Sequence, residues 1–328
     1  MIITHACLEI LDLRTSTHQF SDFELDFTKD LTHEYVSKII EKVNKNCSKR
    51  AGSFHEDSKL KQVLKTYDSN HFIDFSKNVA KVFLESLKEA GILESSDLLV
   101  VEYREDSNTM LGLILLENQE GITHESIASD GKVNNEITKN VYILPTSGLR
   151  INTFLLVSIP DLNFYSVEKL REIDGVKKKV LEESIVNATF HPSTNEVLKA
   201  IKEEAKKISE EAGNDSIQAL STVKNYIYNH GADDEIDIKD LADTLFTDES
   251  NKKDFKEHLA LRGVSLNEPL EYNLVENKVK NQKIKTDTGI ELIVPSEFFK
   301  DNNNLEIIQN DDGTMTIQIK NFTKIIGR

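Results

Sequence analysis

Hydrophobic residues in the first half of the chain follow strand periods and helix periods in turn. Apolar runs of period two, or continuous ones, predict strands, and apolar residues three or four positions apart predict helices. Strands are expected over residues 2–13, 19–27, 98–103, 110–116 and 149–159, and two more flank Asp130-Gly131. Helices are expected from Asp30, over 60–67 and over 72–87. The N-terminal half is therefore predicted to be an antiparallel sheet covered by helices.

The two strands at 98–103 and 110–116 differ from the others because their apolar residues are nearly continuous. A strand with one face in water alternates apolar and polar side chains, whereas a strand covered on both faces does not. These two strands are therefore expected at the centre of the sheet.

The second half of the chain is predicted to begin with helices and to end in strands. Apolar residues at helical spacing occupy 197–208, 217–227, 238–246 and 251–262, and strand patterns follow at 290–294, 305–308 and 315–319. Asp312-Gly313 is a strong hairpin signal between the last two strands. The pattern weakens between Asp161 and Pro192. We expect an α+β protein with domains at 1–165 and 166–328, the second comprising a helical module (about 195–263) and a β unit (about 278–326).

Composition indicates a soluble protein without a membrane span. The 328 residues include 40 basic and 56 acidic side chains, a formal net charge of −16. The longest apolar run, 110–116, is far shorter than the roughly 20 residues of a spanning helix. The N-terminus lacks a signal peptide, so we expect a cytoplasmic location. Cys7 and Cys47 are far apart and have no Cys or His cluster nearby, which favours reduced thiols and no metal site.

Sequence motifs for catalysis are absent. No phosphate-binding glycine loop, zinc-protease motif or nucleophile elbow occurs. Pro160-Asp161 and Glu168-Lys169 resemble part of a nuclease metal site, but metal binding requires several converging carboxylates. We expect neither an enzyme nor a cofactor.

Four lysines close to the C-terminus reverse the overall charge locally. Lys278, Lys280, Lys283 and Lys285, here called the lysine strip, have no acidic residue between them. Such a strip attracts phosphate without reading bases. It contains no aromatic residue, which favours duplex DNA over a surface on which single-stranded bases stack. The alternative is an exposed sheet edge, where lysines prevent aggregation.

Two other basic groups are weaker candidates for phosphate contacts. Lys49 and Arg50 are expected at the C-terminal end of the first helix, and there the alternative is a favourable interaction with the negative end of that helix. The group Lys177, Lys178 and Lys179 lies shortly before Glu182 and Glu183. A mixed group of this kind is usually a solvated surface.

The short helices at 238–246 and 251–262 have the spacing of a helix-turn-helix motif. Residues 233–249 nevertheless contain eight acids and one base, and such a surface repels DNA. An acidic helical surface is better suited to a basic protein partner or to self-association.

Three segments resemble the C-terminal region of the bacterial 37-kDa nucleoid-associated protein family: KNQKIKTDTGIELIVPSEFF, LEII and NDDGTMTIQIKN. The mass of 37.2 kDa agrees. The resemblance implies a cytosolic dimer at the nucleoid, associated in some members with type II topoisomerases. We therefore expect a homodimer that binds double-stranded DNA without sequence specificity. The alternative is an adaptor that docks a basic partner such as a type II topoisomerase.

Overall fold

The computed structural model describes residues 1–15, 17–105, 108–129, 131–146, 151–230, 235–299, 304–310, 312–324 and 326. The chain folds as two compact units, Met1–His191 and Pro192–Arg328. The first contains a large antiparallel sheet with helices, and the second contains helices with small hairpins. The predicted α+β class is confirmed. The domain boundary expected at residues 165 and 166 falls inside strand β9 (Asn163–Val167).

The first unit is built on one antiparallel sheet. Within the described residues its strand order is β12-β3-β9-β8-β5-β4-β1-β2. Besides β9, the strands are β1 (Ile2–Asp12), β2 (Thr17–Gln19), β3 (Arg50–Phe54), β4 (Ser95–Glu105), β5 (Asn108–Glu117), β8 (Phe154–Ser158) and β12 (Ala188–Phe190). As predicted, β4 and β5 are neighbouring inner strands, and most of their residues are buried.

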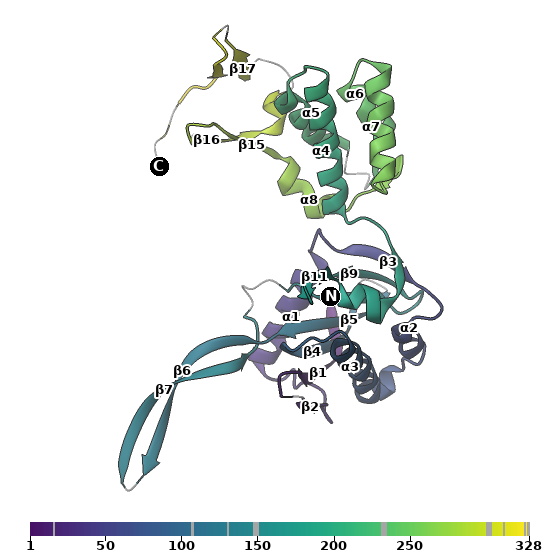
Figure 1. The fold of residues 1–328 in the computed structure, drawn as a ribbon, viewed down its shortest axis with the longest axis vertical. Helices are drawn as coiled ribbons and strands as arrows, with labels where there is room; N and C mark the ends of the chain where they lie inside the picture. The colour runs from purple at the N-terminus through teal and green to yellow at the C-terminus, as the bar shows by residue number, and fades with distance from the viewer. Residues whose placement is uncertain are drawn as a thin grey trace. The chain divides into compact units, whose positions relative to one another are not determined.

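Helices cover both faces of this sheet. Alternate residues of β4 therefore pack in two separate cores, one on each face. Leu98 and Val100 pack in the core that contains α2 (Lys59–Leu64) and α3 (Phe72–Glu89). Leu99 and Val101 pack on the opposite face with α1 (Asp30–Asn44). The three helices predicted for this half are thus present, and they lie against the sheet (Figure 1).

The strand expected over 19–27 is wrong, because β2 ends at Gln19. The buried carboxylate of Glu9 accepts the backbone N–H of Ser21 at 2.7 Å, so that N–H does not join a ladder. Further along the chain, the N–H of Leu25 donates to the carbonyl of Ala6 at 2.8 Å, but this hydrogen bond is not part of a strand ladder. The strand expected from Leu149 likewise starts later, at Phe154, and residues 149 and 150 lie outside the described residues.

A long two-stranded hairpin projects from the first unit (Figure 1). Its strands β6 (Gln119–Ser129) and β7 (Lys132–Ile143), here called the arm, form a separate two-stranded sheet. They confirm the strands predicted around Asp130-Gly131, although Asp130 itself lies outside the described residues. The remaining elements among the described residues of this unit are β10 (Arg171–Ile173), β11 (Val176–Lys178) and the short helices η1 (Ser69–His71) and η2 (Leu181–Val186).

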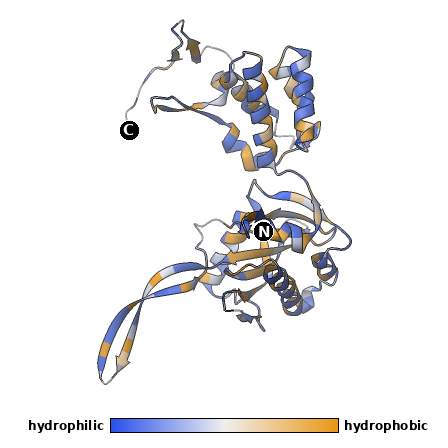
Figure 2. Ribbon diagram, in the orientation of Figure 1, coloured by the Kyte–Doolittle hydropathy of each residue, from blue (hydrophilic) through white to orange (hydrophobic). Residues whose placement is uncertain are grey.

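The arm has three exposed aliphatic side chains on one face. Ile122, Val133 and Ile137 are 76%, 68% and 82% exposed. His124 lies opposite Ile137, and Ala128 lies opposite Val133. Directly paired residues share a face and alternate residues return to it, so the three aliphatic side chains project from the same face of the arm. Figure 2 shows hydrophobic positions scattered among hydrophilic ones along the arm.

The second unit combines the expected helical module with small hairpins. Its helices are α4 (Thr194–Glu211), α5 (Ser216–His230), α6 (Ile238–Leu245), α7 (Glu249–Leu261), α8 (Tyr272–Val279) and η4 (Ser296–Phe299). The hairpins are β13 (Glu235–Asp237) with β14 (Asn267–Pro269), β15 (Asn281–Lys285) with β16 (Glu291–Pro295), and β17 (Leu305–Gln309) with β18 (Met315–Ile319). Ser193 and Glu196 form a capping box that starts α4. The sequence did not predict α8, whose buried stripe consists of only Val275 and Val279.

Candidate nucleic-acid interface

The lysine strip spans the junction between a helix and a strand. Lys278 is in the last turn of α8, Lys280 is its C-cap, and Lys283 and Lys285 are on β15. All four side chains are exposed. On β15, Gln282 precedes Lys283, and Ile284 lies between Lys283 and Lys285. Both Gln282 and Ile284 are buried. Lys283 and Lys285 therefore point to the same exposed face.

An acidic residue lies beside the strip in the folded protein, although none lies between the four lysines in the sequence. Glu291 on β16 forms ion pairs with Lys283 at 2.8 Å and with Lys285 at 3.6 Å. The hydrogen bond from Lys283 lowers the pKa of Glu291. Residues 278–295 still contain four lysines against two acids. Exposed ion pairs of this kind contribute little to stability, so the lysines can exchange Glu291 for a phosphate.

Two further lysines lie beside Lys278. Lys202 on α4 and Lys224 on α5, each half-buried, complete what we call the helical lysine cluster, Lys202, Lys224 and Lys278. Lys202 has a pKa lowered to about 8, first by burial and then by repulsion from Lys224 and Lys278. Burial also lowers the pKa of Lys224. Helices α4, α5 and α8 contact one another (Figure 1).

The cluster is tied to the start of β15. The Lys224 amine donates to the carbonyl oxygen of Asn281 at 2.8 Å, and the Lys278 amine donates to Asn195 Oδ1 at 2.7 Å. The helical lysine cluster and the lysine strip therefore adjoin in the second unit. Together they comprise six lysines: Lys202, Lys224, Lys278, Lys280, Lys283 and Lys285.

The sequence analysis missed Lys202 and Lys224, although the helical pattern contained a signal. Lys202 follows Leu198 by four positions and precedes Ala205 by three. Lys224 has the same spacing from Leu220 and Ile227. Both lysines therefore lie within an apolar helical stripe, where a charged residue is unusual.

Replacing Lys202 with methionine should stabilise the protein at neutral pH. Its pKa of about 8 is below the ordinary value of 10.5, so folding disfavours the charged amine. Because one pKa unit corresponds to about 1.4 kcal/mol and solvent screens part of the effect, we expect a gain of about 1–3 kcal/mol. The gain should be complete below about pH 8 and vanish above 10.5, where the amine is neutral both folded and unfolded.

Denaturant unfolding in buffers without phosphate, at neutral pH and at pH about 11, measures this gain. Lys206→Met is the matched control, because Lys206 is exposed on the same helix and its amine lies 3.6 Å from Glu210. It should leave the free energy of unfolding nearly unchanged. A destabilising Lys202→Met, or a gain independent of pH, would contradict the burial of a charged amine at this position.

The weaker candidates from the sequence lie in the first unit, and Lys49, Arg50 and Lys179 have intramolecular partners. The carboxylate of Glu182 pairs with Arg50 at 3.0 Å and with Lys179 at 2.8 Å, so the fold joins two groups that are distant in sequence. Lys49 donates to the carbonyl of Asn44 at 3.0 Å, where α1 ends. That contact is the interaction with the helix end that the sequence analysis gave as the alternative.

Arg50 begins β3 rather than ending a helix, and its guanidinium lies 5.0 Å from the centroid of the Phe190 ring. Lys177 and Lys178 are exposed on β11. These residues of the first unit stay secondary candidates for phosphate contacts.

An acidic surface is present on α6 and at the start of α7. Asp240, Asp243, Asp248 and Glu249 are exposed there. Lys252 pairs with Asp243 at 3.1 Å and with Glu249 at 2.8 Å, which offsets part of the charge. Residues 233 and 234 of the acidic run lie outside the described residues. The charge of this surface agrees with the sequence argument against a DNA-binding helix-turn-helix.

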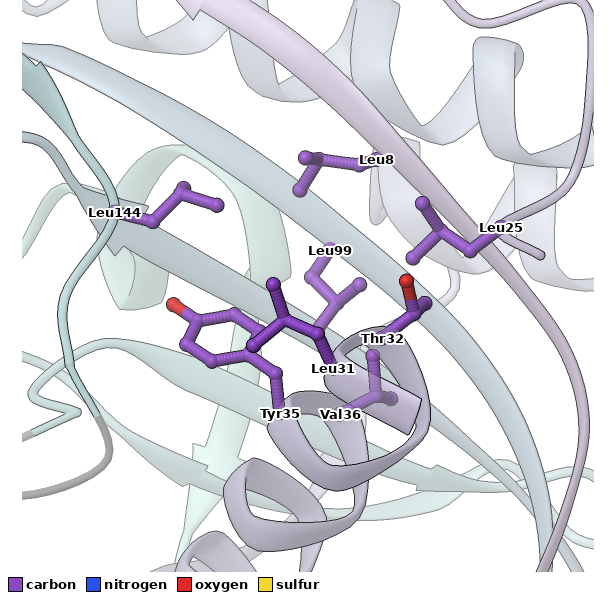
Figure 3. Close-up of a pocket in the computed structure, with 8 residues that line it drawn as sticks. All are labelled: Leu8, Leu25, Leu31, Thr32, Tyr35, Val36, Leu99 and Leu144. Atoms are coloured by element: carbon purple, nitrogen blue, oxygen red, sulfur yellow. The ribbon is translucent and has the colours of Figure 1, made fainter. Parts of the chain in front are cut away.

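A cavity of about 310 Å³ lies between α1 and the sheet of the first unit (Figure 3). Its described lining is apolar except for Thr32 and Tyr35, and the Tyr35 hydroxyl donates to the carbonyl of Pro145 at 2.6 Å. The other lining residues are Leu8, Leu25, Leu31, Val36, Leu99 and Leu144. This cavity offers neither a nucleophile with a base nor a set of metal ligands.

Two other kinds of feature, a cluster of metal ligands and a helix that spans a membrane, are absent from the described ranges. Within those ranges, no group of three or more His, Cys, Asp or Glu residues is arranged to hold a metal ion. No helix there combines the length and the apolar character needed to cross a membrane.

A family model described as nucleoid-associated protein YejK matches residues 9–326. The chain belongs to this family. The match extends over both compact units, and it confirms the resemblance to bacterial 37-kDa nucleoid-associated proteins. Comparison with individually curated proteins gives no match. Family membership associates the chain with the nucleoid and thus with DNA.

Proposed function

We propose that this nucleoid-associated protein binds double-stranded DNA without sequence specificity through the lysines of its second unit. The observation that supports this most directly is that six lysines adjoin on α4, α5, α8 and β15 in a chain of net charge −16. A local positive surface is what a polyanion requires, whatever the sign of the whole protein. No chemical reaction is part of the proposal.

The residue types at this surface favour contact with the DNA backbone. A lysine ammonium is a compact point charge on a flexible stem, and it lacks the planar fork with which arginine reads guanine. The strip contains neither arginine nor an aromatic residue. Contacts from lysine to phosphate position a protein on DNA but carry no sequence information. The expected binding is therefore indifferent to sequence and sensitive to salt.

The arm supports the second part of the proposal, a homodimer. An isolated two-stranded hairpin is marginal in water, and Ile122, Val133 and Ile137 are exposed on one face of the arm. A second copy of the chain offers an identical face, and most soluble homodimers associate through the same patch on both subunits. Such a dimer would contribute two lysine surfaces to one DNA molecule, and linking two sites raises the overall affinity.

A second candidate function is an adaptor for a basic protein partner such as a type II topoisomerase. The observation in its favour is the acidic surface on α6 and α7, where Asp240, Asp243, Asp248 and Glu249 are exposed. Complementary charge speeds the encounter of two proteins and selects partners. In that case the chain would reach DNA through its partner, and its own lysines would be dispensable.

A binding assay with two unrelated duplexes of equal length separates these functions. Fluorescence anisotropy of the full-length chain should give dissociation constants that agree within about threefold, because backbone contacts do not distinguish sequences. Raising the salt concentration from about 50 to 200 mM should weaken both equally. An adaptor predicts no binding to either duplex alone. Strong preference for one duplex would contradict the absence of base readout.

A further inference from the structure

The cavity between α1 and the sheet of the first unit, here called the α1 cavity, opens to the surface. Its volume is about 310 Å³, and its described lining consists mainly of aliphatic side chains from α1, β1 and β4 and from the segments beside them (Figure 3). Val36 and Leu99 are 1% exposed, whereas Leu31 is 80% exposed. The cavity therefore reaches from the core to the solvent, and apolar surface of this kind marks interaction sites on soluble proteins.

The lining of the α1 cavity suits an aliphatic occupant better than water. Ordered water in a cavity needs about two to four polar partners. Among the described lining residues only Thr32 and Tyr35 carry a polar side-chain group, and the Tyr35 hydroxyl already donates to the carbonyl of Pro145. An apolar cavity of about 150 Å³ binds one benzene molecule. The α1 cavity is about twice as large, so it has room for two aliphatic side chains.

The arm presents two aliphatic side chains next to each other. Ile122 lies opposite Lys139, and Ile137 is two residues before Lys139, so Ile122 and Ile137 are diagonal neighbours on one face. They are 76% and 82% exposed. The two isoleucines lie far from the cavity of their own chain. Because β7 is extended, Ile137 is about 20 Å from Ile143 at the root of the arm, and Leu144, the next residue, lines the cavity.

We infer that the α1 cavity receives Ile122 and Ile137 from the arm of a second copy of this chain. The inference rests on the proposed homodimer and specifies its interface as contact between arm and cavity. Two-fold symmetry makes the contact reciprocal, because each copy supplies one arm and one cavity. A stable interface takes about 20–30 residues from each partner, whereas the aliphatic face of the arm has three exposed aliphatic side chains. The cavity supplies apolar surface that the arm alone lacks.

The charges beside these two surfaces are complementary. Residues 24–35, which supply half of the described cavity lining, contain four acids and one lysine. On the arm, Lys139 and His124 lie directly opposite the two isoleucines on the aliphatic face. Several of these groups also have partners within the same copy, but exposed ion pairs contribute little to stability and can exchange partners. Complementary charge favours this partner over others.

Cross-linking between two different full-length variants tests the contact. One variant carries Ile137→Cys and a mass tag, and the other carries Leu31→Cys. Both also carry Cys47→Ser, and the native Cys7 is fully buried. After subunit exchange, a short bismaleimide should join the two variants. Leu93→Cys in place of Leu31→Cys is the control, because Leu93 is 73% exposed but is not among the described lining residues. It should give about tenfold less product.

A second pair of variants measures what the cavity contributes to the dimer. Leu31→Glu should raise the dimer dissociation constant about tenfold in sedimentation, because it places a charge at an apolar contact. Leu93→Glu should leave the constant unchanged. Both side chains are exposed, and circular dichroism should show that both variants remain folded.

The outcomes separate this inference from the proposed function. Ile137→Cys that cross-links only to itself would overturn the inference but keep association through the arm, since two arm faces would then meet. Stable dimers without product in either mixture would also overturn it and place the interface elsewhere. A wild-type chain that sediments as a monomer would overturn the homodimer together with the inference. DNA binding is measured by a separate assay and does not depend on the cross-link.

Discussion

Glutamine at Lys280, Lys283 and Lys285 together should weaken binding to random duplex DNA by about ten- to a hundredfold at low salt. In the proposed mode of binding each of these exposed lysines contacts one phosphate, and a hydrogen bond to a charged group contributes about 1.5–3 kcal/mol before the cost of ordering the side chains. Buried Gln282 and Ile284 are unchanged, so β15 should still pair with β16. Fluorescence anisotropy at fixed salt measures the loss.

The matched control for this variant is the triple substitution of Lys199, Lys206 and Lys253 with glutamine. These lysines are exposed on α4 and α7 and lie 3.6–3.7 Å from glutamates one helical turn away. The change in net charge is the same, so a general electrostatic effect would weaken DNA binding equally in both variants. Equal losses would locate the DNA-binding surface elsewhere, and so would an unchanged affinity in the first variant.

Glutamate at Ile122 and Ile137 should convert a homodimer into monomers. Burying one isoleucine side chain contributes about 1.5–3 kcal/mol, so the two changes should raise the dimer dissociation constant more than about a hundredfold. Both residues project from the same face of the arm, away from the cores of the first unit. Sedimentation at micromolar concentration measures the oligomeric state, and a monomer should bind DNA more weakly.

The opposite face of the arm supplies the control for this experiment. Thr123 and Asn134 are exposed there, and glutamate at both positions adds the same two charges. That variant should remain a dimer. A wild-type chain that is already monomeric would contradict association through the arm. Dimers that survive the isoleucine substitutions would place the self-interface on another surface.

The sequence predicted those elements whose signal lies within one short segment. The strands β4 and β5 were predicted because continuous apolar runs require burial on both faces. The strand expected to reach Phe27 failed because the buried Glu9 carboxylate takes the N–H of Ser21. That contact joins residues from two segments, and no local pattern reports it. The helix α8 was missed because two buried valines in eight residues are too few to define a period.

For the candidate site too, the sequence predicted the part with a local signal and missed the part that depends on packing between distant segments. The lysine strip was found because its change of sign occurs within eight consecutive residues. The approach of Glu291 follows from its pairing with Lys285 across the turn of a hairpin, and the second strand of that hairpin was predicted. Lys202 and Lys224 meet Lys278 only through the packing of three helices. Their helical positions mark them as unusual, but only the fold shows that they lie together.

The salt dependence of duplex affinity tests most directly whether the lysines of the second unit hold DNA. The logarithm of the association constant should fall linearly with the logarithm of the salt concentration, with a slope of about −0.9 for each phosphate neutralised. The slope of the Lys280, Lys283 and Lys285 glutamine variant should therefore be shallower than that of the wild type by about 2.7. Identical slopes for the two proteins would show that these lysines do not contact the DNA backbone.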